Sequence, residues 1–176
     1  MSNPRGFKQK LAAVSRHWDG KDYEAALAEV EAMLDNWPGN AHLHLLWASL
    51  LQLQEHPTHD LAAAKQALQQ AVELDKGSPA AAVELGHYLD NVEDDPQAAA
   101  KAYAEGVASA RQLLIDGLIG QAKAYRQLEK REEFLRCLME AMQLTQFDTG
   151  AKRAKADRPG TEQIQDLLSE LVDRPA

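Results

Sequence analysis

The chain has 176 residues, of which 45% are hydrophobic and 6% aromatic, and its formal net charge is -8. This length suits one domain, and the low aromatic content with abundant Ala, Leu, Glu and Gln favours packed helices over a sheet. The negative charge argues against a nucleic-acid backbone or an anionic membrane as the main partner, because long-range repulsion opposes the encounter.

No apolar run approaches the ~20 residues of a membrane span, and the N-terminus lacks the apolar region of a signal peptide. The single cysteine, Cys137, leaves no partner for an internal disulfide and agrees with a reducing compartment. We therefore expect a cytoplasmic protein.

The N-terminal third predicts three helices. The first runs from about Pro4 to Trp18 and turns Phe7, Leu11 and Val14 inward. The second follows Asp19-Gly20 and ends before Pro38, which cannot continue a helix. Its apolar or small residues lie three and four apart, as in a buried helical stripe: Tyr23, Ala26, Leu27, Val30, Met33 and Leu34. The third begins near Ala41, after the Gly39-Asn40 turn.

The middle of the chain continues in the same way. Asp60 is expected to cap the helix that follows the turn of residues 55–60, and Gly77-Ser78-Pro79 opens the next one. Residues 91–96 form an acidic turn. The break predicted at residues 109–112 is poorly marked, so a nearly continuous or kinked helix is the alternative. Gly117 and Gly120 lower helix stability, and we expect them to permit close contact between helices.

These helix pairs resemble the tetratricopeptide repeat (TPR) family, whose repeat is about 34 residues long. Three places carry the resemblance in the second helix of each repeat. The early small place falls on Ala26, Ala64, Ala99 and, as a larger residue, Phe134; the large apolar place on Val30, Leu68, Tyr103 and Leu138; the second small place on Met33, Ala71, Gly106 and Ala141. The first helices carry a large-small pair as Trp47-Ala48 and Leu85-Gly86, more weakly as Gln121-Ala122 and hardly at all as Ala13-Val14. The resemblance implies an all-α, TPR-like solenoid of about four repeats.

The C-terminal part differs from the repeats. We predict a solenoid over residues 1–144, a polar basic linker over 145–160 with Lys152, Arg153, Lys155 and Arg158, and an amphipathic helix over 161–173 capped by Thr161. The apolar stripe of that helix has three possible partners: the open end of the fourth repeat, the protein's own groove, or a second copy.

Chemistry is not indicated by any motif. The chain lacks nucleotide-binding, hydrolase and zinc-protease signatures, and Cys137 falls where a packing role is expected, so we predict no enzyme activity and no cofactor. His42 and His44 are two apart and face different sides of a helix. His56 and His59 lie in a turn without other metal ligands, so no metal site is predicted.

The resemblance implies a binding groove on the concave face, lined by the first helix of each repeat. The residues at these places that we take as candidates are Leu11, Ser15, Trp18, Leu45, Ser49, Val83, His87, Asp90, Ile119, Lys123 and Arg126. Leu11 with Ser15, and Leu45 with Ser49, replace the paired Lys and Asn with which some TPR proteins clamp a terminal carboxylate, so that mode of binding is disfavoured.

The sequence therefore predicts a non-enzymatic scaffold that binds a protein or peptide client in its groove. One alternative is a secretion chaperone, because small acidic cytosolic TPR proteins of this size resemble the chaperones of secreted translocator subunits. Such a chaperone holds an aggregation-prone client before secretion. Another is a self-associating adaptor, a homodimer formed through the C-terminal helix. Fold alone does not choose among them.

Overall fold

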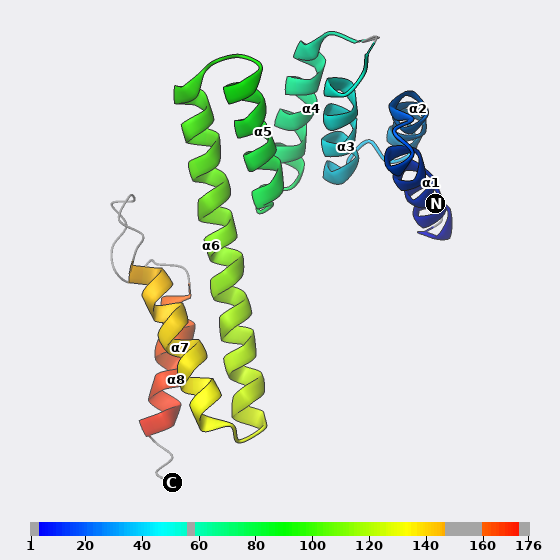
Figure 1. The fold of residues 1–176 in the computed structure, drawn as a ribbon. Coiled ribbons are helices and arrows are strands. Elements are labelled where there is room, and N and C mark those ends of the chain that lie inside the picture. Colours follow the sequence, from blue (N-terminus) through cyan, green and yellow to red (C-terminus); the bar gives the residue numbers. More distant parts are fainter. Residues whose placement is uncertain (1–3, 56–58, 147–159, 173–176) are drawn as a thin grey trace. The chain divides into compact units, whose positions relative to one another are not determined.

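The computed structural model describes residues 4–55, 59–146 and 160–172, and within these ranges all regular secondary structure is helical. The helices are α1 (Pro4–Asp19), α2 (Tyr23–Leu34), α3 (Ala41–Gln52), α4 (Leu61–Leu74), α5 (Pro79–Asn91), α6 (Pro96–Gln127), α7 (Arg131–Gln146) and α8 (Thr161–Val172) (Figure 1). The predicted all-α class is confirmed. In the described part of the chain, no helix is both long enough and apolar enough to cross a bilayer.

The helices begin where the sequence supplies caps. The side chains of Asp22, Asn40 and Asp60 accept hydrogen bonds from the backbone N–H groups of Ala25, Leu43 and Ala62, each at 3.2 Å. These bonds satisfy donors that the first turn of a helix leaves without a partner. Pro79 and Pro96 open α5 and α6, where a missing N–H costs nothing.

Two compact units make up the chain: unit 1 comprises residues Met1–Val107 and unit 2 comprises Ala108–Ala176. The boundary between them falls inside α6, upstream of the division that we predict near residue 144. Residues 147–159, which include the four basic residues of the predicted linker, lie outside the described part of the chain.

The core of unit 1 follows the three repeat places. Ala26, Val30 and Met33 have no exposed surface, and Ala64, Leu68 and Ala71 at the equivalent places of α4 are at most 1% exposed. In the third pair, Ala99 is buried while Tyr103 packs partly buried beside Leu85. Gly106 lies so close to α5 that an added Cβ would come 2.8 Å from Val83 Cγ2. The repeat pattern thus marks the helix-packing faces correctly.

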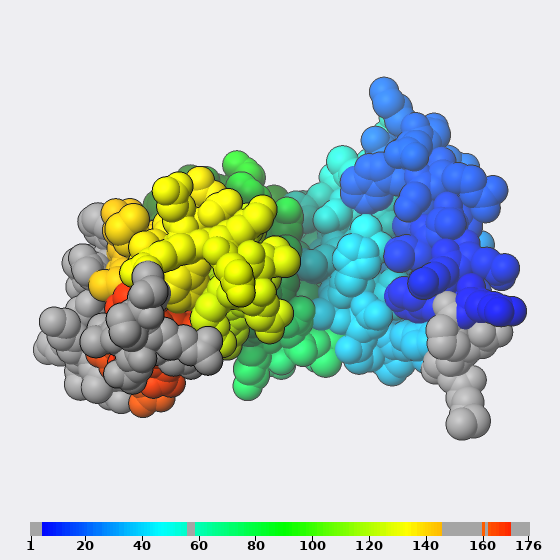
Figure 2. All heavy atoms as spheres, turned by 90° about the horizontal axis from the view of Figure 1, so that it is seen from below, coloured from blue at the N-terminus to red at the C-terminus, as the bar shows by residue number. Residues whose placement is uncertain are grey.

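Unit 2 has a separate core. Ile115, Leu118, Ile119 and Ala122 of α6 pack with Phe134, Cys137, Leu138 and Ala141 of α7 and with Ile164 and Leu167 of α8. Helix α8 lies alongside α7 (Figure 1), and Figure 2 shows the red atoms of α8 directly beside the yellow atoms of α7. Helix α8 thus packs against its own chain in unit 2, where Ile164 and Leu167 contribute to the core.

The start of α8 corrects one detail. Thr161 is the first helical residue and not the cap, because the residue before it, Gly160, has φ 78° and its carbonyl accepts the N–H of Ile164 at 3.0 Å. Glycine suits this position twice over, since an added Cβ would also come 2.8 Å from Ile115 Cγ2.

Helix α6 runs without interruption for 32 residues, so of the two readings of residues 109–112 the continuous helix holds and the break does not occur. The prediction that Gly117 and Gly120 permit close contact between helices is wrong for the described part of the chain. A Cβ added to either glycine would meet no described atom within 4 Å. Within the described helices, the glycines that permit close contact are Gly86, against Tyr103, and Gly106.

Candidate functional site

A pocket of about 200 Å³ opens between α1 and α3 in unit 1. Its lining residues are Leu11, Val14, Ser15, Trp18, Asp19, His42 and Leu46. Val14 is 2% exposed, whereas Leu11, Trp18 and Leu46 are partly buried, and Ser15, Asp19 and His42 are exposed. We call this feature the α1–α3 pocket.

Helix periodicity brings the α1 side of the pocket together. Leu11, Val14, Ser15 and Trp18 are three or four residues apart and therefore share one face. The Trp18 ring meets the Tyr23 ring edge-on, with centroids 6.0 Å apart. The backbone carbonyl of Trp18 accepts the N–H of Lys21 at 2.9 Å. The end of α1 is thereby tied to the start of α2, which holds the indole in place.

The polar groups of the pocket stand around an apolar interior. The Ser15 hydroxyl donates to the Leu11 carbonyl at 3.2 Å and so is turned toward its own helix. Asp19 supplies a carboxylate at the C-terminal end of α1, and His42 supplies an imidazole from the first turn of α3. A ligand side chain in this pocket would meet aliphatic and indole surface with a negative charge beside it.

Three predicted residues, Leu11, Ser15 and Trp18, thus lie together in the pocket. Leu45 and Ser49 of α3 are partly buried, and Leu45 packs against the core of unit 1. On α5, Val83 packs toward Gly106 of α6.

His87 and Asp90 of α5 are exposed near Tyr103 of α6. The Tyr103 hydroxyl and His87 Nδ1 are 2.8 Å apart, and the two rings meet edge-on with centroids at 5.3 Å. Burial raises the pKa of Tyr103 above its usual range, and the carboxylates of Asp90 and Glu84 raise it further. The Tyr103 hydroxyl donates to His87 Nδ1 in the tautomer that leaves this nitrogen without a proton.

The remaining predicted residues belong to unit 2. Lys123 and Arg126 are exposed, as a ligand-binding role requires. Ile119 is only 2% exposed, because it packs in the core of unit 2 with residues of α7 and α8. Its predicted place in the groove is wrong for this reason: the side chain that would contact a ligand is covered by the protein itself.

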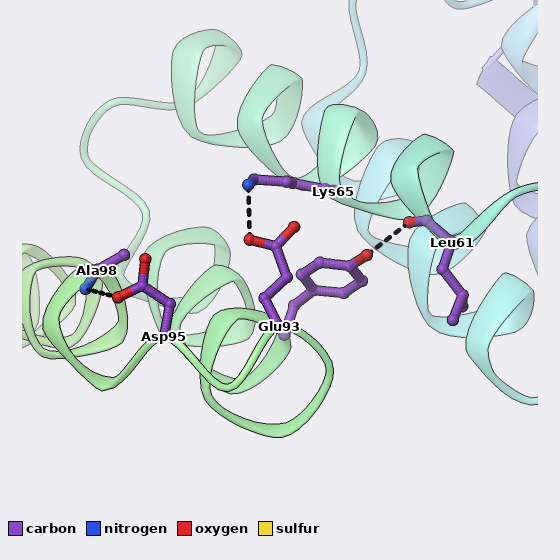
Figure 3. Close-up of polar contacts among 6 residues, drawn as sticks. Leu61, Lys65, Glu93, Asp95 and Ala98 are labelled. Carbon is purple, nitrogen blue, oxygen red and sulfur yellow. Dashed lines mark hydrogen bonds and ion pairs between the residues drawn. The ribbon is translucent and has the colours of Figure 1, made fainter.

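The acidic turn between α5 and α6 is tied to unit 1 by its own contacts. Glu93 accepts a hydrogen bond from Lys65 Nζ at 2.7 Å, Tyr88 donates to the Leu61 carbonyl at 2.8 Å, and Asp95 accepts the N–H of Ala98 at 3.0 Å (Figure 3). The bond to Glu93 raises the pKa of Lys65. These acidic residues thus serve the fold by holding α4, α5 and α6 together.

Two of the histidines considered as metal ligands, His44 and His59, have structural partners. His44 Nε2 lies 2.8 Å from the Pro38 carbonyl, and His59 Nε2 lies 3.0 Å from Glu31 Oε1, which also accepts the Trp47 indole N–H at 3.1 Å. His56 lies outside the described residues. Within residues 4–55, 59–146 and 160–172, no three His, Cys, Asp or Glu side chains gather as a metal site would require.

Comparison with protein-family models and with the sequences of curated proteins finds no match. Among solved structures, a crystal structure of MamA matches with a TM-score of 0.53 and 18% sequence identity, over 82% of this chain and 81% of that one. A second, titled as the crystal structure of MamA protein, matches with a TM-score of 0.50 and 17% identity, over 94% and 86%. MamA is a TPR-like helical solenoid. The chain has a TPR-like fold.

A TPR-like fold explains why the pocket lies where it does, between the first helices of two successive pairs. Besides Leu11, Ser15 and Trp18, the pocket is lined by Val14, which the sequence predicts to face inward, and by three residues that are not among the candidates named above: Asp19, His42 and Leu46. Helix α3 is apolar on most of its circumference, as its sequence AHLHLLWASLLQ shows, so periodicity could not separate Leu46 from Leu45. Asp19 lies at the end of α1, and the TPR pattern does not cover it.

Proposed function

We propose that this protein is a non-enzymatic interaction module that binds a segment of another protein on unit 1, with an apolar anchor side chain in the α1–α3 pocket. The observation that carries the proposal is the pocket itself, an apolar cavity on a TPR-like scaffold. Its volume fits one large side chain, and burial of such a side chain stabilises a complex by about 1.5–3 kcal/mol.

The charge around the pocket selects the sequence next to the anchor. Asp19 lines the pocket, and Asp22 lies near His17, with His17 Nδ1 and Asp22 Oδ2 3.7 Å apart. A Lys or Arg beside the apolar anchor would pair with these carboxylates, whereas an acidic neighbour would be repelled. The preferred client segment therefore combines a Leu, Met or aromatic residue with an adjacent basic residue.

Binding without catalysis agrees with the state of the reactive groups. Cys137, the single thiol of the chain, is 4% exposed within the core of unit 2 and donates to Gln121 Oε1 at 3.7 Å. A thiol needs exposure and a basic environment to act as a nucleophile. Rigid helices instead hold the pocket in one shape, which reduces the entropy lost on binding.

The test is a selection of peptides from a displayed random library on the wild-type protein, followed by calorimetric titration of the selected peptides. The variant Ser15→Trp places a large side chain at the rim and should weaken the selected peptides about tenfold or more. Gln69→Trp, on the exposed face of α4, is the matched control and should bind as the wild type does.

Asp19→Lys should remove the preference for a basic residue beside the anchor. Equal binding to wild type and Ser15→Trp would show that the pocket is not the site. Selected peptides without an apolar anchor would reject the proposed ligand chemistry.

A further inference from the structure

The C-terminal half of α6 carries an exposed apolar face that unit 2 does not use. We call it the α6 face and define it by Leu113, Leu114, Gly117, Gly120, Ala124 and Leu128. Leu113, Leu114 and Leu128 are 64%, 49% and 63% exposed, and Gly117, Gly120 and Ala124 are exposed as well. The N–H of Leu128 donates to the Ala124 carbonyl at 3.1 Å, so Leu128 continues the helical register.

The α6 face lies on the side of the helix away from the core of unit 2. Ile115, Ile119 and Ala122 are turned into that core, and α7 and α8 lie along that side of the helix (Figure 1). Residues 113, 117, 120, 124 and 128 are three or four apart and so form a second stripe. A surface helix of a monomer normally places charged or polar residues there.

Gly117 and Gly120 favour the close packing of a second helix against the α6 face. Glycine is among the least favourable residues in a helix interior. Neither Gly117 nor Gly120 has a described atom within 4 Å of an added Cβ, so no neighbour in the described part of the chain requires a glycine there. The separation of two packed helices depends on the side chains at the contact, and glycine and alanine allow the closest approach.

We propose that the α6 face is the interface of a symmetric dimer, in which α6 of one copy packs antiparallel against α6 of a second copy. The order of large and small side chains along the α6 face is self-complementary about a twofold axis between Gly120 and Gln121. Leu113 of one copy then lies opposite Leu128 of the other, and Gly117 lies opposite Ala124. A twofold interface needs such a surface, because the same patch serves both subunits.

Charge favours the antiparallel direction. Asp116 and Lys123 are both exposed and are seven residues apart, which places them on the same edge of the α6 face. In the antiparallel pair, Asp116 of one copy lies about 3 Å along the axis from Lys123 of the other, and the contact occurs twice. In a parallel pair, the edge that carries Asp116 and Lys123 in one copy lies beside the opposite edge of the other copy, so the pairing of Asp116 with Lys123 is lost.

The proposal is tested by light scattering on the full chain over about a hundredfold range of concentration. We expect the molar mass to rise with concentration toward twice the 19.4 kDa of one chain. Leu113→Glu should weaken the dimer about 100-fold or more, because each substitution acts twice. Gly120→Leu should weaken it similarly, while circular dichroism stays that of the wild type, because its site is open in the single chain.

Met139→Glu is the matched control, since Met139 of α7 is 58% exposed and lies outside the α6 face. It should dimerise as the wild type does. Asp116→Lys and Lys123→Asp should each weaken the dimer, and the double variant should restore it.

A wild type that stays monomeric at every concentration would overturn the proposal. So would a dimer that both Leu113→Glu and Gly120→Leu leave unchanged, or one that is lost only when residues 161–176 are removed, since that result would place the contact on α8.

Discussion

Glycine residues of this chain have opposite roles that depend on what surrounds each one. At Gly106, an added Cβ would lie 2.8 Å from Val83 Cγ2, 3.2 Å from the Pro79 carbonyl oxygen and 3.3 Å from the Val83 nitrogen. Two of these three atoms belong to the backbone of α5 and cannot rotate away. The second small place of the repeat therefore needs glycine here, although alanine fills it in α4 and α7.

Gly106→Ala should lower the free energy of unfolding by about 1–3 kcal/mol, because α5 and α6 must move apart. Gly117→Ala is the control, since nothing described lies near its Cβ, and it should raise stability by about 0.5–1 kcal/mol. Urea denaturation followed by circular dichroism, at a protein concentration low enough to keep the chain monomeric, measures both. A Gly106→Ala variant as stable as Gly117→Ala would contradict the close approach of α5 to α6.

Helix α6 is the element that the repeat pattern describes least well. In a repeat array, the second helix of the third pair and the first helix of the fourth are separate, yet here they form one helix from Pro96 to Gln127. The cause is local. Arg111 stands where the closing proline of the repeat belongs, and neither proline nor glycine occurs between Val107 and Asp116. A segment of helix-forming residues continues as a helix.

The variant Ala110→Pro tests this continuity. Proline inside a helix removes one backbone hydrogen bond and clashes with the carbonyl four residues earlier, so it should cost about 3 kcal/mol or more. Ala110→Gly, which leaves the hydrogen bond in place, should cost about 1 kcal/mol. Urea denaturation monitored at the helical circular dichroism band distinguishes them. Equal stability of the two variants would mean that the helix is already broken near residue 110.

Across the whole molecule, the buried core is predictable from the sequence, and the binding site is predictable only in part. Ala26, Val30, Ala64 and Leu68 are buried because the repeat pattern and the packing pattern have the same physical origin, a helix face that its neighbour covers. The site was less predictable. Leu11, Ser15 and Trp18 share the pocket because one helix presents all three, but Ile119 depends on where α8 packs. The spacing of Ile115, Leu118, Ile119 and Ala122 marks a buried stripe on α6, but it does not say which element covers that stripe.

The division into two units predicts that the two cores can unfold separately. Leu68 in unit 1 and Leu138 in unit 2 occupy the same place of the repeat, and each is 1% exposed. Replacing either by alanine should cost about 2–5 kcal/mol, because both leave a cavity in a closed core. All three tryptophans, Trp18, Trp37 and Trp47, belong to unit 1, so their fluorescence reports on that unit, while circular dichroism reports on both.

Leu68→Ala should therefore move the fluorescence transition to lower urea. Leu138→Ala should leave the fluorescence midpoint nearly unchanged and move only part of the circular dichroism signal, because the cores of the two units have no residue in common. Helix α6 belongs to both units, so it could carry a loss of stability in unit 2 to unit 1. If Leu138→Ala shifts both signals together, that helix couples the cores strongly enough for the chain to unfold as one cooperative unit.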